Sequence, residues 1–389
     1  MSAPEVRLHE RIADIDAGLW DSCANSDGEF NPFLSHAFLK ALEDSGSVGG
    51  RSGWRPMHVE VRQNQALIGF VPLYAKGHSQ GEYVFDHNWA DAYQRAGGRY
   101  YPKLQCSVPF TPATGRRVLP VRDEAGLEAT LFTALAAVLE QTELSSLHVT
   151  FMTESQWNRA GGKGYLQRID QQFHWHNRGY ASFEDFLAEL TSKKRKDLRR
   201  ERRDALASGI EVEWVTGNDL TEAHWDAFFQ FYMDTGSRKW GSPYLTREFF
   251  SEINRTFAAH TLLILCKREG RYIAGALNFI GSQTLYGRNW GCTEYHPFLH
   301  FETCYYQAID FAISRGLQRV EAGAQGQHKI ARGYEPQATW SAHWIRDEGF
   351  RDAVARYLVR ERQHVQADIE WVAEHLPFRQ ETSGDGSAT

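Results

Sequence analysis

The sequence predicts an α/β protein with a mixed sheet, built from two copies of one unit in tandem. Three observations predict this fold class. At 389 residues, the chain exceeds what a single hydrophobic core usually supports. Segments with helical periodicity alternate with strand-like runs, in the order helix, antiparallel strands, helix, strand. This order recurs in the second half with similar residues at four places, which indicates two units of roughly 150 residues each.

The elements of the first unit follow from the spacing of its apolar residues. Ser35 can cap a helix that carries Phe38 and Leu42 on one face. Residues 63–65 provide a turn between two strand-like runs. We expect, in chain order, helices over 8–23 and 31–46, a hairpin over 56–76, a strand over 81–86, an aromatic loop over 87–104, a helix over 125–142 and a strand over 147–151.

The second unit repeats these segments in the same order. Asn88 and Trp89 of the first unit correspond to Asn289 and Trp290 of the second. One similarity could arise by chance, but four in succession favour a duplication, with a ligand groove near the junction of the units. The matching segments are 242–254 with 31–43, 261–281 with 56–76, 284–295 with 81–93, and 301–316 plus 319–324 with the closing helix and strand.

A basic segment connects the two units. Residues 182–209 predict one helix that Ser182 caps and Gly209 ends. Its part 193–203 carries eight basic and two acidic residues, although the whole chain has a net charge of −6. These cations repel one another unless phosphates of coenzyme A or tRNA neutralise them; a solvated helix face is the alternative. The expected phosphate-binding residues are Lys193, Lys194, Arg195, Lys196, Arg199 and Arg200.

Composition and the ends of the chain set further expectations. We place one domain at 1–178, a second at 179–378 including the basic helix, and a disordered tail at 379–389. The five cysteines are scattered without a CxxC pair, which favours neither a zinc site nor a disulfide framework and fits a reducing compartment. Because no window approaches the roughly 18 apolar residues of a membrane span, we expect a soluble, cytoplasmic protein without a metal site.

A polar loop after the strand 319–324 is the strongest site candidate. It places donors and cations at the carboxyl end of a strand, where α/β folds gather ligand sites. Lys329 and Arg332 are three residues apart, so on one helical turn both could address an anion, while His328 could move protons near neutral pH. Gln325 adds an amide to the same loop. A solvated surface loop is the alternative.

Other candidates lie before this loop and in the first unit. Glu302 is expected in the first turn of a helix, with Tyr305 one turn later; a capped core helix is the alternative. The aromatic segments after the third strand of each unit could line facing walls of a groove, or their tryptophans could fill cores. These groove candidates are Asp86, Trp89 and Asp91 in the first unit, and Arg288 and Trp290 in the second.

Glycine motifs and catalytic signatures exclude several enzyme classes. Residues 159–164 fit the RxxGxG pattern of acetyltransferase pyrophosphate loops, but they follow a short expected helix, so a helix end and turn are favoured. The sequence contains no Walker loop, dinucleotide fingerprint, GxSxG elbow or HExxH pair. Kinase, dehydrogenase, α/β-hydrolase and common zinc-protease functions therefore lose support.

Several segments together resemble one family of bacterial proteins. They are PFLSHAFLKALE, GEYVFDHNWADAY, YYPKL, PFTPATGRRVL, KKRKDLRRERR, PYLTREFF, LYGRNWGC, LHFETCYYQAID and GAQGQHKIARGYEP, in order over residues 30–350. The family is the GNAT-type, FemAB-like proteins described as peptidoglycan biosynthesis/recognition. The resemblance implies two tandem GNAT-like domains in a Fem-type arrangement, each a mixed sheet flanked by helices.

The resemblance also implies a transferase. Fem-type relatives move an amino acid from aminoacyl-tRNA to an amine of a cell-wall precursor, and other GNAT proteins use acyl-CoA. The run 328–334 looks similar to a Phe-Lys-x-x-Phe-Gly element of Fem-type proteins, which implies a phosphate- or carbonyl-polarising role for Lys329. We therefore expect an N-acyl or aminoacyl transferase that forms an amide on an amine acceptor, with acyl-CoA or aminoacyl-tRNA as co-substrate and no bound cofactor.

Residue roles follow from this expectation. Glu302 or His328 would accept the proton, and Lys329 with Arg332 would stabilise the anion. The alternative functions are a non-catalytic protein that recognises a peptidoglycan or peptide fragment, and an RNA-binding protein that uses 193–203. The substrate-binding residues would be Asp86, Trp89, Asp91, Arg288, Trp290, Tyr305, Gln325 and Arg332.

Overall fold

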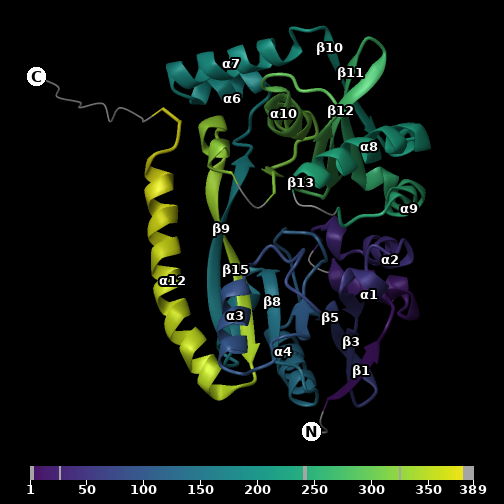
Figure 1. Ribbon diagram of the computed structural model, residues 1–389, viewed down its shortest axis with the longest axis vertical. Helices are drawn as coiled ribbons and strands as arrows, with labels where there is room; N and C mark the ends of the chain where they lie inside the picture. Colours follow the sequence, from purple (N-terminus) through teal and green to yellow (C-terminus); the bar gives the residue numbers. More distant parts are fainter. Residues whose placement is uncertain (1–3, 26–27, 240–242, 324–325, 380–389) are drawn as a thin grey trace, which may run out of the picture.

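The computed structural model describes residues 4–25, 28–239, 243–323 and 326–379, whose strands form two sheets (Figure 1). The expected mixed α/β class is confirmed, because parallel and antiparallel pairs occur in the larger sheet. The smaller sheet has the order β1 (Glu5–His9), β3 (His58–Gln63), β4 (Ala66–Val71), β7 (Leu119–Pro120). The larger sheet has the order β10 (Ile210–Thr216), β11 (Thr261–Arg268), β12 (Arg271–Ile280), β13 (Thr284–Cys292), β14 (Arg319–Glu321), β9 (Leu166–His176), β15 (Glu335–Ile345), β8 (Ser146–Met152), β6 (Lys103–Cys106), β5 (Leu73–Lys76), β2 (Trp54–Pro56).

Helices pack around the sheets (Figure 1). In the described part of the chain, none is long and apolar enough to cross a membrane. They are α1 (Ala17–Ala24), α2 (His36–Asp44), α3 (His87–Arg95), α4 (Ala125–Glu140), α5 (Glu154–Gly161), α6 (Phe183–Glu189), α7 (Ser192–Leu206), α8 (Glu222–Lys239), α9 (Arg247–Phe257), α10 (Leu299–Phe301), the π-helical turn η6 (Glu302–Tyr306), α11 (Gln307–Ser314), the 3₁₀ segment η7 (Gln327–Arg332) and α12 (Glu348–Glu374).

The first half departs from the sequence expectation at two places. The expected helix over 8–23 is wrong in its first part, because β1 pairs with β3 and α1 begins only after Asp16, whose carboxylate accepts from the Leu19 backbone at 2.8 Å. The expected strand over 81–86 is also wrong. That segment is irregular, and α3 occupies the start of the expected aromatic loop. The proposed match of 81–93 with 284–295 therefore pairs a helix with a strand.

The basic segment forms two helices instead of one. Ser182 caps α6 as expected, with its hydroxyl 3.2 Å from the Asp185 backbone nitrogen. The helix then stops because Leu190 is fully buried in an extended conformation and forms a β-bridge with Phe378. The Thr191 backbone nitrogen donates to the Pro377 carbonyl at 3.0 Å, and α7 begins directly afterwards. Residues 377–378 therefore pair with the two residues that separate α6 from α7.

The two halves of the chain share the larger sheet. β9, from the first half, lies between β14 and β15 of the second half. β15 in turn lies between β9 and β8, pairing with both in antiparallel register. Figure 1 shows β9 and β15 side by side along α12. The helix α12 packs on these two strands. Arg168 of β9 forms a bidentate ion pair with Glu361 of α12, and both hydrogen bonds are 2.8 Å long.

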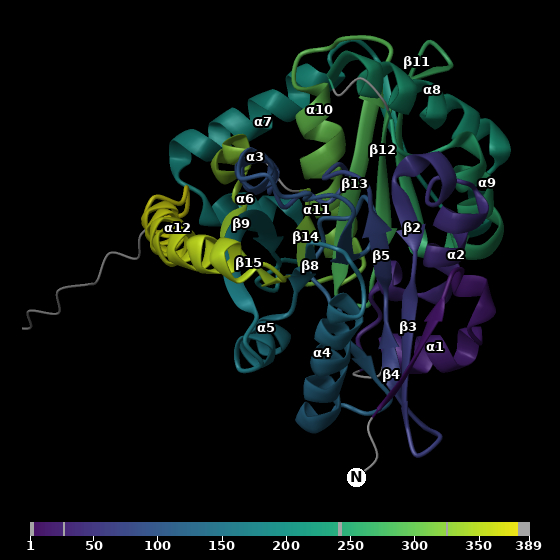
Figure 2. The same cartoon turned by 60° about the horizontal axis from the view of Figure 1, so that its bottom comes forward.

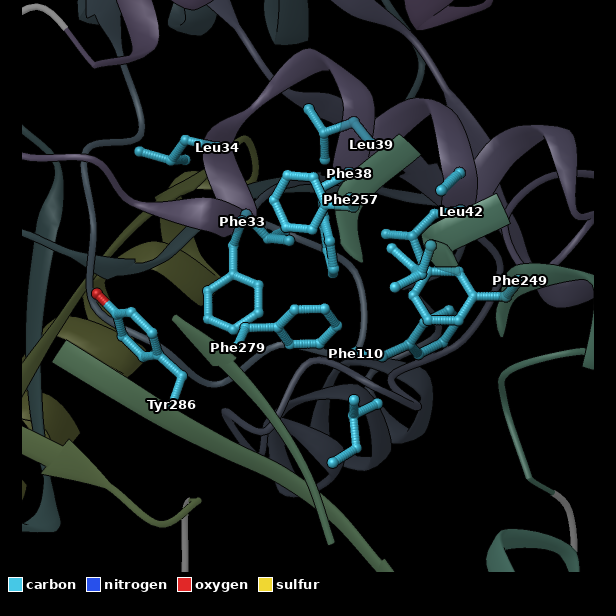
Figure 3. Close-up of a cluster of buried hydrophobic side chains, with 14 of the residues drawn as sticks. Phe33, Leu34, Phe38, Leu39, Leu42, Phe110, Phe249, Phe257, Phe279 and Tyr286 are labelled. Atoms are coloured by element: carbon cyan, nitrogen blue, oxygen red, sulfur yellow. The ribbon is translucent and has the colours of Figure 1, made fainter. Parts of the chain in front are cut away.

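An aromatic core joins the halves as well (Figure 3). Phe33 and Phe38, just before and within α2, contact Phe279 of β12 with ring centroids 5.5 and 5.3 Å apart. Phe38 also contacts Phe249 of α9 at 6.0 Å. Aromatic rings contribute large buried areas, so this core fixes the first half against β12 and β13. It lies directly beside the opening described below.

Replacing Gly291 of β13 by Ala is expected to lower the free energy of unfolding by about 3 kcal/mol. A Cβ at this position would lie 2.1 Å from the carbonyl oxygen of Phe231 in α8, a backbone atom that cannot rotate away. Urea unfolding measures the loss. Gly126→Ala is the matched control, because nothing lies within 4 Å of its Cβ. Equal stability of the two variants would contradict the close approach of α8 to β13.

Candidate active site

β13 and β14, both labelled near the centre of Figure 2, separate after a short parallel pairing. The pairing ends at Tyr286 and Glu321, after which β13 continues along β12 to Cys292. A cavity of about 100 Å³ occupies the opening between the two strands. Residues of β12, β13 and η6 line it, together with Ala322 after β14. Strands that diverge in this way expose backbone groups of β13 that β14 no longer pairs with.

Arg288 lies at a β-bulge in the wall of this cavity. Leu277 pairs with Asn289 and Asn278 pairs with Gly287, so Arg288 is the extra residue of β13. Its guanidinium donates to the carbonyl of Phe110 and lies 5.6 Å from the ring centroid of Phe33. Burial lowers the pKa of Arg288. The bulge therefore aims this side chain toward the first half of the chain.

Glu321, the last residue of β14, is a buried carboxyl next to the same opening. It is 6% exposed, and its Oε2 atom has no hydrogen-bond partner among the described residues. His174 Nε2 lies 3.9 Å from this oxygen. Burial raises the pKa of Glu321 to about 7, although the positive charges of Arg319 and Arg288 oppose the shift. The carboxyl can therefore exchange a proton near neutral pH.

Two of the predicted polar loop residues contact η6. His328 Nε2 lies 2.8 Å from the hydroxyl of Tyr305, which lines the cavity. Lys329 is 1% exposed and donates to the carbonyl of Gly323 at 2.8 Å. Burial lowers its pKa to about 8, and it interacts with Cys304, another lining residue. The structure thus brings His328, Lys329 and Tyr305 together.

Arg332 and Glu302 join the site to the basic helix α7. Arg332 donates to Glu201 at 2.8 Å and stacks 3.4 Å from the ring centroid of Phe301. Glu302 is fully buried, and its two oxygens accept from Arg202 at 3.1 and 2.9 Å. The Glu302 side chain therefore faces α7 and does not line the cavity.

The six cations predicted to bind phosphate lie on α7, at the top of Figure 1. Arg199 pairs with Glu184, and Arg200 pairs with Asp197 at 3.3 Å. Lys193 and Lys196 are exposed, and Lys194 and Arg195 are half-buried. Because Arg202 and Glu201 tie α7 to η6 and η7, these cations lie on the same side of the sheet as the cavity.

The groove candidates of the first half lie elsewhere. Asp86 is buried beside Lys103, whose Nζ lies 2.5 Å from its Oδ2 atom. Trp89 packs on His343 with ring centroids 4.9 Å apart, and Asp91 is exposed on α3. The expected groove between these residues and Arg288 or Trp290 is wrong, because α3 turns their side chains toward other cores and solvent.

Trp290 and His300 separate the cavity from a second pocket of about 290 Å³. Their ring centroids are 5.3 Å apart, and both residues line both spaces. Cys292 and Leu299 add apolar walls to the second pocket. The two spaces together follow β13 past the point where β14 leaves it. Gln325, the remaining predicted residue, lies outside the described residues.

The comparisons with known proteins identify the family. A model of the FemAB-like family, described as peptidoglycan biosynthesis/recognition, matches residues 11–380. The chain belongs to the FemAB-like family. The resemblance to this family and the association with peptidoglycan expected from the sequence are thereby confirmed at the level of the family. No curated protein matches this FemAB-like chain.

Solved structures show the same fold at low sequence identity. FemX matches this FemAB-like chain with a TM-score of 0.57 and 11% identity, covering 90% of the chain and 100% of FemX. L-PGS from Bacillus licheniformis matches with a TM-score of 0.50 and 10% identity, covering 90% and 98%. A tandem GNAT protein from the clavulanic acid biosynthesis pathway matches with a TM-score of 0.46 and 11% identity, covering 88% and 98%. The match to FemX confirms the expected mixed α/β fold in a Fem-type arrangement.

Sequence reasoning missed Glu321 in this FemAB-like chain. The residue ends a strand of three residues, and the sequence carries no sign that its Oε2 atom is buried without a hydrogen-bond partner among the described residues. The one available signal is an acidic residue at the carboxyl end of a strand, next to the small residues 322–324. Glu321 lies next to the opening only because β13 and β14 separate there, and this separation depends on tertiary structure.

Proposed function

We propose that this FemAB-like chain is an N-acyl or aminoacyl transferase that forms an amide on an amine acceptor, such as a peptide or cell-wall precursor. The observation that carries the proposal is Glu321, a buried carboxyl with a pKa of about 7 at the opening between β13 and β14. A group with this pKa accepts protons efficiently at the pH of the cell. Family membership supports the same class of reaction.

The donor binds along the unpaired edge of β13. Its carbonyl lies in the cavity beside Arg288, where the bulge offers backbone N–H groups outside the strand ladder to the developing oxyanion. The rest of the donor follows the second pocket past Trp290 and His300. Its phosphates contact the cations of α7, which lie on the same side of the sheet. Both acyl-CoA and aminoacyl-tRNA carry phosphates that suit this face.

The reaction is an attack by the acceptor nitrogen on the donor's carbonyl carbon. A C–N bond forms, and the C–O bond of an ester or the C–S bond of a thioester breaks. Glu321 takes the proton that the nitrogen loses, and the leaving oxygen or sulfur takes up a proton. Lys329, which is cationic below its pKa of about 8, supplies positive charge near the cavity, and the carbonyl of Gly323 holds its ammonium group. Glu302 holds α7 against η6 through Arg202.

A direct transfer assay tests this proposal. The purified chain is incubated with labelled acetyl-CoA, longer acyl-CoAs or charged tRNAs, together with amine acceptors that include lysine peptides and cell-wall precursors. We expect an amide product, identified by mass spectrometry, from one donor class. Thermal unfolding with each donor gives an independent measure of donor binding. If an acceptor binds but no donor gives a product, the result would contradict the transferase proposal and favour a non-catalytic recognition protein.

Reversing the charge of Lys193 and Lys196 is expected to weaken donor binding at least tenfold. Both lysines are exposed on α7, and each lost phosphate contact reduces the dependence of log affinity on log salt concentration by about one. Fluorescence anisotropy with charged tRNA, and calorimetry with coenzyme A, measure affinity at two salt concentrations. Arg95→Glu with Lys163→Glu is the matched control, because both residues are exposed in the first half. Equal losses in the two double variants would contradict a phosphate site on α7.

A further inference from the structure

The first turn of α7 lacks the groups that usually stabilise the start of a helix. In the described residues of α7, the side chain of Thr191 at the N-cap accepts no backbone hydrogen bond, and the first turn contains no acidic residue. Four consecutive basic residues, 193–196, lie at this end instead. The helix dipole places partial positive charge there, so these cations destabilise the turn. The start of α7 therefore depends on contacts from outside the helix.

Residues 377–379, here called the C-terminal segment, provide such contacts. In Figure 1 the chain rises along α12 toward α6 and α7. The Thr191 backbone nitrogen donates to the carbonyl of Pro377 at 3.0 Å, and the Arg379 backbone nitrogen donates to the carbonyl of Glu189 at 2.8 Å. Backbone hydrogen bonds on both sides of the junction between α6 and α7 thus fix the position at which α7 begins.

Phe378 anchors the C-terminal segment through its side chain. The residue forms a β-bridge with Leu190, and its partly buried ring packs against the hydrophobic core that contains Leu190 and Leu198 of α7. The guanidinium of Arg178 lies 4.5 Å from the centroid of the same ring, within the range of a cation–π contact. One core therefore holds both the C-terminal segment and the inner face of α7.

We infer that the C-terminal segment holds the first turn of α7 in its helical conformation and so positions Lys193 and Lys196 for phosphate binding. The inference rests on the proposed function, in which the cations of α7 contact the phosphates of the donor. Without the segment, binding would include the entropic cost of ordering this turn. Phe378 is thus a positioning residue, which acts through α7 and not on the donor itself.

The second half of α7 is attached independently of the C-terminal segment. Arg202 donates to Glu302 at 2.9 Å, and Glu201 accepts from Arg332 at 2.8 Å. These contacts tie α7 to η6 and η7, beside the cavity. Loss of the C-terminal segment is therefore expected to loosen the first turn alone and to leave the groups around the cavity in place. Donor affinity and kcat should respond differently for this reason.

Hydrogen exchange of the full-length Phe378→Ala variant tests the hold on α7. We expect the amides of residues 191–196 to exchange about tenfold faster than in the wild type, and those of 200–206 to be unchanged. Phe378→Leu retains the apolar bulk and should behave as the wild type. Trp371→Ala is the matched control, because Trp371 is an exposed aromatic residue of α12. Wild-type exchange over 191–196 in Phe378→Ala, confirmed as folded by circular dichroism, would overturn the inference.

Donor binding measures the consequence for the site. The affinity of Phe378→Ala for coenzyme A, by calorimetry, and for charged tRNA, by fluorescence anisotropy, is expected to fall by about fivefold or more for the class that binds the wild type. With a productive donor, KM should rise by the same factor while kcat stays within about twofold.

A second substitution tests the cause of the weaker binding. Thr191→Asn supplies a stronger N-cap without a change in charge, and Thr191 is exposed. Added to Phe378→Ala, it should restore both slow exchange and donor affinity. Weak binding that Thr191→Asn leaves unchanged would overturn the inference.

The same measurements separate this inference from the proposed function. If the wild type binds neither coenzyme A nor charged tRNA, the phosphate site of the proposed function is wrong, and the positioning role falls with it. Faster exchange over 191–196 with wild-type donor affinity would overturn the inference alone. Amide product with an unchanged donor KM in Phe378→Ala would support the transferase and overturn the inference.

Discussion

Glu321→Gln is expected to lower kcat at pH 8 by about 10²- to 10⁴-fold, the usual contribution of a general base. The wild-type rate should rise with pH and level off above the Glu321 pKa of about 7, because only the ionised carboxylate accepts a proton. The residual rate of the variant should lack this titration. Initial rates between pH 5.5 and 8.5 measure both effects. Glu335→Gln is the matched control, because Glu335 pairs with the exposed Arg178 at the start of β15.

The same variant should be at least as stable as the wild type at pH 8. Because burial raises the Glu321 pKa from 4.5 to about 7, the folded state favours the neutral carboxyl. Ionisation therefore costs stability as the pH rises from 4.5 through 7, by roughly 3 kcal/mol above that range. Gln carries no charge and avoids this cost. A low kcat combined with lower urea stability at pH 8 would contradict the catalytic role, and so would wild-type turnover.

Lys103→Met is expected to lower the free energy of unfolding by about 3–5 kcal/mol at pH 8, the largest stability effect predicted for this chain. Lys103 is fully buried at the start of β6 and contacts Glu82 and Asp86 at 2.7 and 2.5 Å. Removing the ammonium leaves two carboxylates buried together, and Lys76, 3.8 Å from Glu82, is mostly neutral at pH 8 because its pKa is about 7. Urea unfolding measures the loss, and Lys40→Met, on the surface of α2, should cost less than about 1 kcal/mol.

The loss should be smaller at pH 5 than at pH 8. Burial raises the pKa of Glu82 to about 7, and the Lys103 charge opposes this rise, so loss of the lysine moves the Glu82 pKa further upward. At pH 5 this carboxyl is therefore neutral in the variant, and one of the two uncompensated charges is gone. Adding Glu82→Gln and Asp86→Asn to Lys103→Met should recover most of the stability at pH 8. A triple variant as unstable as the single one would contradict the electrostatic explanation.

Local rules predicted the elements whose sequence signals are strong. Ser35 caps α2 as expected, with its hydroxyl 3.3 Å from the Phe38 backbone nitrogen. The helical periodicity over 301–316 corresponds to α10, η6 and α11, and the loop after β14 approaches this helix through His328 and Tyr305. These features depend on neighbours in sequence or on the rule that ligand groups gather at strand ends.

The features that local rules did not predict depend on contacts with residues far away in sequence. The apolar residues within 81–86 favour a strand, yet Glu82 and Asp86 turn inward to reach Lys103, and the chain continues into α3. Glu302 has the sequence signature of a helix-start carboxylate, but Arg202, a hundred residues earlier, occupies both of its oxygens. Glu321 becomes a candidate base only because β13 and β14 separate there. Periodicity carries no information about these contacts.

The exchange of strands around β9 constrains how the chain is made. The large sheet cannot close during synthesis until β15 emerges, because β8 and β9 pair with a strand that lies about 160 to 200 residues further along the chain. Until then their edges are open to other chains, and long-range pairing of this kind forms slowly. Neither half of the chain can therefore complete the large sheet alone, because β15 of the second half pairs with β8 and β9 of the first.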